Sequence, residues 1–163
     1  PGRYSEYFSG TAPTHHLYGL RVSLDMLQAE GMAQVWARHD TLARAIWAAC
    51  DAWSEQGDLR LNVVDPAHRS RAVTAAALTA PDATRLRHWL SERAGVTLGI
   101  GLGMAPPDDP AGDGFFRFGH MGHVNAHMVL GMLSSVQAGM AALGIAHGAG
   151  GMDAATAIIA DRA

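Results

Sequence analysis

The apolar residues of this chain follow a helical period in some segments and a strand period in others, and the order of these segments restricts the possible folds. Four residues near the N-terminus recur at helical spacing: Leu17, Leu20, Leu24 and Leu27. A second helical pattern runs from Val35 to Trp53. Beyond it the patterns predict strands at 59–63 and 73–78, a helix at 81–94, strands at 96–102 and 115–118, a long helix at 125–143 and a short one at 153–160. This order predicts an α+β fold with a small sheet covered by helices on one face.

The chain contains no lysine, because all 12 of its Lys+Arg residues are arginine. Lysine is the side chain that forms Schiff bases with carbonyl groups and that acts as an amine base. Any chemistry that requires such an amine therefore has to draw on groups outside this chain.

Composition excludes several classes of protein. A hydrophobic content of 48% with 17% charged residues is typical of a globular protein. A net charge of −3 gives no electrostatic basis for binding nucleic acid or an anionic membrane, and no apolar run reaches the roughly 18 residues of a membrane span. The single cysteine, Cys50, cannot form an internal disulfide, and its helical pattern predicts a buried, inert thiol in a cytoplasmic protein.

Three glycines alternate at Gly99, Gly101 and Gly103, which is reminiscent of a phosphate-binding loop. The dinucleotide-binding pattern needs a further glycine where this chain has Met104, and it needs a helix where this chain has a loop rich in Pro and Asp. The pattern therefore favours a strand end whose backbone lies close to a neighbour or a ligand.

Three histidines, His120, His123 and His127, lie close together in the sequence and could in principle bind zinc or nickel. No carboxylate stands beside them to orient a ligand. We therefore expect them to be structural or to face a substrate, and we predict no metal site.

Arg117 is the only charged residue in an aromatic strand segment, Phe115–Gly119. A guanidinium in such a strand is costly unless an anion pairs with it, and its two parallel donors match a carboxylate. Two interpretations stay open from the residues alone: a clamp for a substrate carboxylate, and a structural arginine at the strand edge paired with Asp113.

Several segments of the chain are similar, in the same order, to segments of class V aminotransferases of the alanine–glyoxylate and serine–glyoxylate (pyruvate) type. These segments span about residues 4 to 143: Phe8–Pro13 leading into Leu17–Arg21, Val35–His39, Asp65–Arg69 with Val73–Thr74, Gly99–Gly103, and Arg117–His123. The resemblance implies a fold-type I transferase that uses pyridoxal 5'-phosphate, in which amino groups pass between amino acids and 2-oxo acids through the cofactor.

The resemblance also implies a division of the chain. Residues 1–30 would be the end of the large cofactor-binding domain, and residues 31–163 the C-terminal small domain. The Schiff-base lysine of the family lies upstream, in a large-domain portion that is missing here, so we expect no catalytic residue within this chain and no activity from it alone. The resemblance also implies that the complete protein is a homodimer.

Site residues follow from the positions that match. Arg117 falls where the family binds the substrate α-carboxylate. Thr11 falls where a threonine binds the cofactor phosphate of the other subunit, and Phe8 and Gly10 belong to the same cofactor-binding segment. That segment departs from the family, because Phe8 replaces a tyrosine, and Ser9 and Gly10 replace two histidines. His120 also stands where we expect an apolar residue.

The expected function is transfer of an amino group between alanine or serine and glyoxylate or pyruvate. A Gly-His-Met-Gly run after Arg117 leaves a second interpretation open, a pyridoxamine–pyruvate type of transaminase. A third is a non-catalytic small-domain module that dimerises or binds a metal.

Overall fold

The computed structural model describes Arg3 and residues 6–161, and it divides into two compact units, Pro1–Ala37 and Arg38–Ala163. The boundary between these units lies inside a helix, α2 (Met32–Ser54), a few residues after the domain boundary expected at residues 30–31. The assignment of the two parts to a large and a small domain remains a prediction.

The N-terminal unit consists of a short turn, helix α1 (Thr14–Glu30) and the first turns of α2. Helix α1 starts after Pro13 and ends at Gly31, where φ is 84° and the N–H bonds to the carbonyl of Leu27. No residue of α1 is buried. The predicted apolar stripe therefore exists as a helix, but its leucines do not contribute to a core in this chain.

The C-terminal unit contains a four-stranded antiparallel sheet. The strands are β1 (Arg60–Leu61), β2 (Val73–Ala77), β3 (Gly99–Ile100) and β4 (Phe115–Gly119), in the order β1-β2-β4-β3. Helix α3 (Asp82–Trp89) continues as a wider turn over Leu90–Ala94, and α4 (Ala126–Leu143) and α5 (Gly151–Ala160) complete the unit. The order of elements predicted from periodicity is confirmed.

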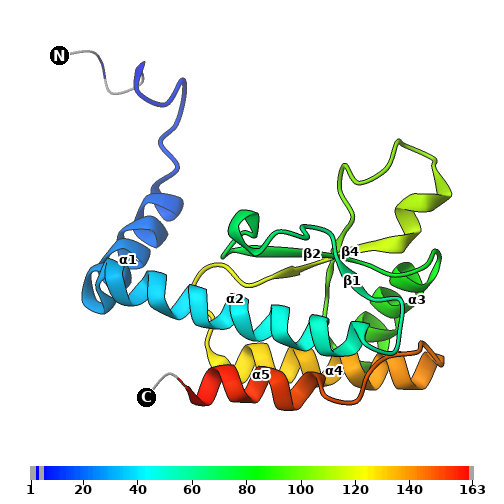
Figure 1. Cartoon of the computed structure of the whole chain (residues 1–163). Coiled ribbons are helices and arrows are strands. Elements are labelled where there is room, and N and C mark those ends of the chain that lie inside the picture. The colour runs from blue at the N-terminus through cyan, green and yellow to red at the C-terminus, as the bar shows by residue number, and fades with distance from the viewer. Residues whose placement is uncertain (1–2, 4–5, 162–163) are drawn as a thin grey trace. The chain divides into compact units, whose positions relative to one another are not determined.

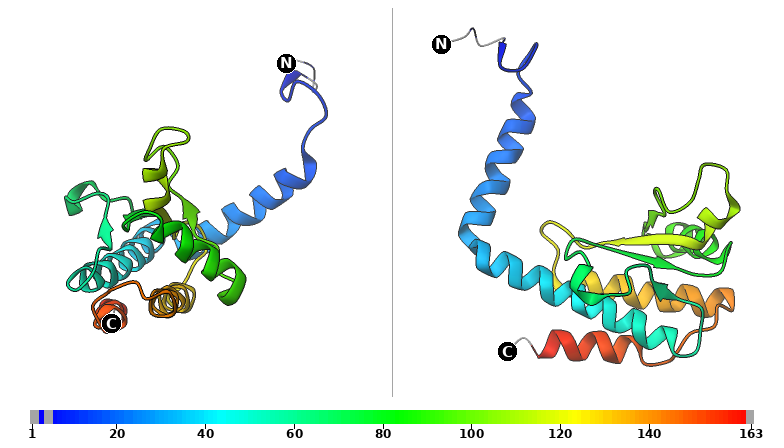
Figure 2. Two further views of the ribbon diagram at one scale, coloured as in Figure 1. Left: turned by 90° about the vertical axis from the view of Figure 1, so that its right-hand side faces the viewer. Right: turned by 45° about the horizontal axis from the view of Figure 1, so that its top comes forward.

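The core lies between the sheet and the helices on one of its faces. Figures 1 and 2 show α2, α4 and α5 running side by side on that face of the sheet. Phe116 and Phe118 point toward these helices, are fully buried, and meet edge to face with ring centroids 5.1 Å apart. The predicted α+β class, a small sheet covered by helices, is confirmed.

Strands β1 and β3 are much shorter than the sequence pattern predicted. Each pairs with its neighbour through only two residues, Arg60 and Leu61 with Ala77 and Ala76, and Gly99 and Ile100 with Arg117 and Phe116. Both are edge strands, and alternating apolar residues beyond the paired positions do not extend a strand without a partner.

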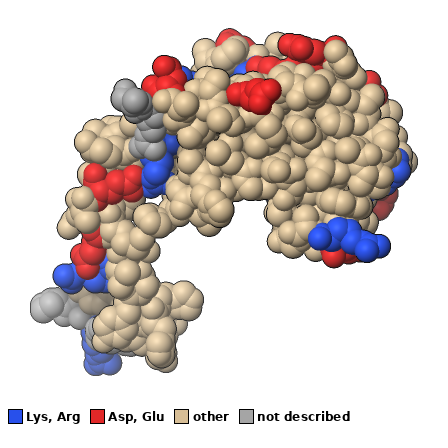
Figure 3. Space-filling view, turned by 90° about the horizontal axis from the view of Figure 1, so that it is seen from below, with Lys and Arg blue, Asp and Glu red and all other residues tan. Residues whose placement is uncertain are grey.

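Helix α4 contains no acidic residue, lysine or arginine, and Figure 3 shows few charged residues on the helical side of this unit. Among the described residues it is the one helix that is long and apolar enough to cross a membrane. Its inner side already packs into the core through Val129, Leu133, Val136 and Met140. Packing therefore accounts for the apolar character of that side.

Candidate functional site

Arg117 lies on the open face of the sheet. Side chains alternate between the two faces of a strand, so burial of Phe116 and Phe118 directs Arg117 away from the core. Its partners across the sheet are Ala75 on β2 and Gly99 on β3. Because both neighbours are small, nothing on the adjacent strands covers the guanidinium.

The guanidinium of Arg117 makes one hydrogen bond with the residues that the structure describes. Its Nε donates to the backbone carbonyl of Ile100 at 2.7 Å. Asp113, the structural partner considered above, instead accepts from the hydroxyl of Thr84 at 2.8 Å. In the described part of the chain no carboxylate forms an ion pair with Arg117. Its two terminal nitrogens are therefore free to donate to a ligand.

A hollow of about 250 Å³ opens beside Arg117. Its walls are formed at one end of the sheet by small and apolar residues of β2, β3 and β4 and the segments next to them, and by one residue of α4: Val73, Thr97, Leu98, Gly99, Gly119, Met121 and Met132. Of the described residues that line it, Arg117 alone is charged. A small anion with an apolar or hydroxylated body fits this environment better than a ligand with several charges.

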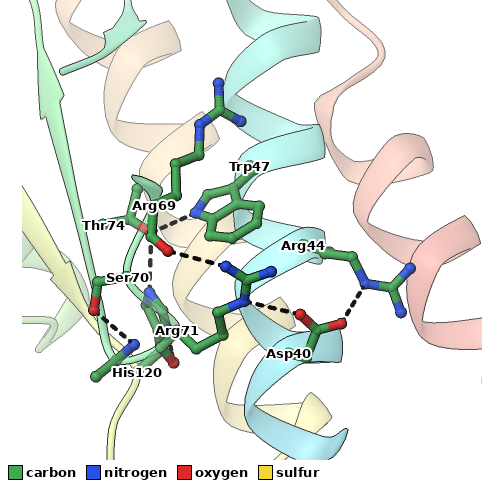
Figure 4. A network of polar contacts seen from close by, with 9 residues as sticks. Asp40, Arg44, Trp47, Arg69, Ser70, Arg71, Thr74 and His120 are labelled. Atoms are coloured by element: carbon green, nitrogen blue, oxygen red, sulfur yellow. Dashed lines mark hydrogen bonds and ion pairs between the residues drawn. The ribbon is translucent and has the colours of Figure 1, made fainter. Parts of the chain in front are cut away.

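A series of hydrogen bonds connects α2, β2 and the residue after β4 on the core side of the sheet (Figure 4). Trp47 Nε1 on α2 donates to Thr74 Oγ1 on β2 at 2.9 Å, and Thr74 Oγ1 lies 2.9 Å from His120 Nε2. His120 Nδ1 lies 3.1 Å from the carbonyl of Arg71. The carbonyl can only accept, so Nδ1 carries the proton and Nε2 accepts from Thr74. The sequence predicted that His120 is structural or faces a substrate, but it did not predict these hydrogen bonds.

Burial lowers the pKa of His120 to about 4, because a charged imidazole in the core would lack the hydration that it has in water. The ordinary histidine pKa is higher, so between about pH 6.5 and pH 4 the unfolded chain binds more protons than the folded one. The free energy of unfolding should therefore fall as the pH falls through this window, by on the order of 2 kcal/mol from this residue.

We expect His120→Gln to flatten this dependence. The amide does not titrate, and the other eight of the 9 histidines stay in both proteins. Urea unfolding of the two proteins between pH 7 and pH 4 would measure the difference. Identical slopes in the two proteins would show that His120 does not carry the proton linkage.

Three other arginines near these hydrogen bonds are held by partners within the unit. Arg69 donates to the carbonyls of Val63 and Val64. Arg71 donates to Asp40, which also accepts from Arg44 (Figure 4). The guanidiniums of Arg69 and Arg71 lie 5.5 and 5.2 Å from the centre of the Trp47 ring. These contacts make Arg69 and Arg71 weaker candidates for a substrate clamp than Arg117.

The predicted cofactor-binding residues Phe8, Gly10 and Thr11 lie together in the turn before α1, in the N-terminal unit. All three are exposed, and the turn requires positive φ at Ser9 (51°) and at Gly10 (156°). The structure thus groups these three residues, whereas Arg117 belongs to the other unit.

The remaining histidines do not form a metal site with their neighbours. His123 and His127 are exposed and His120 is buried, so the three do not converge. Within residues 3 and 6–161 no group of three or more His, Cys, Asp or Glu side chains is arranged to hold a metal ion. Cys50 is buried as expected, and burial raises the pKa of its thiol.

Comparison with known proteins identifies a family and several related sequences. The sequence model of the family described as Aminotransferase class-V matches residues 2–113. The chain is 35% identical over 80% of its length to serine–glyoxylate aminotransferase from Hyphomicrobium methylovorum. It is 33% identical over 83% of its length to L-aspartate–glyoxylate aminotransferase from Paracoccus denitrificans.

A solved structure supports the fold. Pyridoxamine–pyruvate aminotransferase from Mesorhizobium loti superimposes with a TM-score of 0.82 at 30% identity and covers 96% of this chain. The chain corresponds to 38% of that protein and to 30% of the Hyphomicrobium relative.

The small antiparallel sheet with helices on one face is thus the C-terminal small-domain architecture of a pyridoxal-phosphate-dependent transferase. More specifically, the chain belongs to the class V aminotransferase family.

Proposed function

We propose that the protein carrying this chain is a transaminase, and that Arg117 binds the α-carboxylate of its amino acid and 2-oxo acid substrates. The observation that carries the proposal is the guanidinium on the open sheet face, with Nε bound to Ile100 and both terminal nitrogens available. A planar carboxylate can accept from both of these nitrogens at once, and lysine could not offer this geometry.

Pyridoxal phosphate, when bound, supplies the electron sink for amino-group transfer. The residues of this chain fit a supporting part in that site. The exposed Thr11 hydroxyl is suited to donate to a phosphate, and Phe8 lies in the same turn without a hydroxyl of its own. No lysine is present, so the amine that holds the cofactor lies outside this chain. The segment alone is therefore inactive.

Thr11 acts on the cofactor of the other subunit in this proposal, so the working transaminase is a homodimer. The amino donor is alanine or serine and the acceptor is glyoxylate or pyruvate. The uncharged walls of the hollow beside Arg117 support substrates with a single carboxylate. A second candidate is exchange between pyridoxamine and pyruvate. It is supported by the Gly-His-Met-Gly run after Arg117 and by the 30% identity to the Mesorhizobium enzyme over 96% of this chain.

The lysine-bearing polypeptide that contains this chain provides the test. Borohydride reduction in the presence of pyridoxal phosphate should label one lysine outside residues 1–163. Alanine and serine should then each be tested as donors with glyoxylate and with pyruvate, beside aspartate and pyridoxamine. Turnover with alanine or serine is the expected result. Turnover with pyridoxamine alone would support the second candidate, and no turnover with any donor would contradict both.

A further inference from the structure

The alternating glycines at Gly99, Gly101 and Gly103 are not explained by the proposed function, and the structure places one of them, Gly99, against Arg117. Gly99 lies directly opposite Arg117 in the β3–β4 pair. Ile100, the next residue, supplies the carbonyl that accepts from Arg117 Nε at 2.7 Å. The side chain of Arg117 thus lies across β3 and does not extend straight out from the sheet.

A side chain at position 99 would disturb this arrangement. A Cβ added to Gly99 would lie 3.3 Å from Arg117 Cβ, 3.3 Å from Nε and 3.5 Å from Nη2. Arg117 Cβ is fixed by the backbone of β4, whereas Nε and Nη2 belong to the flexible end of the side chain. The guanidinium is therefore the group that can move by the few tenths of an ångström that the added Cβ requires. The atom displaced would be Nε, which makes the hydrogen bond to Ile100.

Gly101 has a different role. A Cβ there would collide with Cβ of Phe115 and lie 3.3 Å from its backbone. This glycine keeps the chain after β3 close to β4, and it does not meet Arg117. The two glycines together thus explain why a strand end here carries so little side-chain volume.

We propose that Gly99 and the carbonyl of Ile100 are positioning groups for Arg117, an inference that rests on the proposed function. They hold the guanidinium against β3 with Nε occupied, so the substrate carboxylate binds end-on, to Nη1 and Nη2. Binding from the side, through Nε and Nη2, is closed because Nε is already committed. With Nε fixed, the two terminal nitrogens present a single orientation to a planar anion.

A double-mutant cycle in the lysine-bearing polypeptide tests this. Gly99→Ala should raise KM for both amino acid and 2-oxo acid about fivefold, the loss expected for one hydrogen bond, with kcat nearly unchanged. In the Arg117→Lys background, Gly99→Ala should change KM by less than about twofold, because a lysine has no Nε–H to displace. Gly131→Ala is the matched control, since a Cβ there meets nothing within 4 Å.

The cycle separates positioning from folding. If Gly99→Ala merely damaged the fold, KM or activity would change equally in both backgrounds, and that result would overturn the inference. An unchanged KM for Gly99→Ala in the Arg117 protein would overturn it as well. A failure of the proposed function itself would give a different result. If Arg117 does not bind the substrate carboxylate, Arg117→Lys alone should have the KM values of the wild type.

A direct readout that does not depend on activity uses the same lysine-bearing polypeptide. By NMR, the Arg117 Nε–H should exchange slowly with water, and it should exchange faster in Gly99→Ala while Gly131→Ala leaves it slow. Equal exchange in the wild type and in Gly99→Ala would contradict the positioning role, whatever the activity measurements show.

Discussion

Arg117→Ala should reduce kcat/KM of the proposed transaminase by at least about 100-fold. Two charge-assisted hydrogen bonds to a carboxylate contribute about 1.5–3 kcal/mol each, and each 1.4 kcal/mol corresponds to a factor of ten. Both half-reactions should lose activity, because amino acid and 2-oxo acid present the same carboxylate to the same guanidinium. Arg117→Lys should recover part of the loss, since it keeps the charge but not the paired donors. Steady-state kinetics with each substrate varied in turn would measure these effects.

Arg93→Ala is the matched control. Arg93 is exposed, and the substitution removes the same charge outside the proposed site. Cofactor affinity should hardly change in either variant, because the groups proposed to hold the cofactor lie elsewhere. If Arg117→Ala released the cofactor while sparing KM for the amino acid, the clamp would have to be sought at Arg69 or Arg71, despite their existing partners.

The side of the sheet that carries Arg117 could be predicted from the sequence, because it depends only on local alternation. Phe116 and Phe118 are apolar and Arg117 lies between them, so burial of the phenylalanines decides where the arginine points. The glycine pattern at 99–103 also predicted a close approach of the backbone to a neighbour. Which neighbour it was could not be predicted, since this depends on the register between β3 and β4.

The hydrogen bonds that join Trp47, Thr74 and His120 could not be predicted from the sequence either, because they also depend on how the strands pair. Thr74 is 27 residues from Trp47 and 46 residues from His120, and no local period connects them. A threonine within an otherwise apolar strand and a histidine just after another strand were the available signals. Only the antiparallel pairing of β2 with β4 brings them together.

The roles of Phe8, Gly10 and Thr11 rest on a different kind of inference. Their exposed turn has no chemistry that distinguishes it from other surface turns. The prediction that it binds a cofactor phosphate comes from resemblance alone. A residue that works across a subunit interface leaves little trace in the packing of its own chain.

Trp53→Ala should have the largest effect on stability, lowering the free energy of unfolding by about 3–5 kcal/mol. Trp53 is the largest fully buried side chain, and it joins three segments of the C-terminal unit. From α2, its Nε1 donates to Gln137 on α4 at 3.1 Å, and its carbonyl accepts from the N–H of Gly148 at 2.9 Å. At Gly151, the first residue of α5, an added Cβ would collide with the indole.

Truncation would leave a cavity among these helices, and the amide oxygen of Gln137 would lose its donor. Both effects lower the free energy of unfolding. Trp53→Phe should cost less, because it keeps most of the volume and loses mainly the hydrogen bond to Gln137. Trp36→Ala is the control, since that indole is 67% exposed and its loss should leave the unfolding midpoint nearly unchanged. Urea unfolding of the three variants gives the comparison. A loss below about 1 kcal/mol for Trp53→Ala would mean that the core of α2, α4 and α5 does not depend on this side chain, because a large-to-small change in a close-packed core costs more than that.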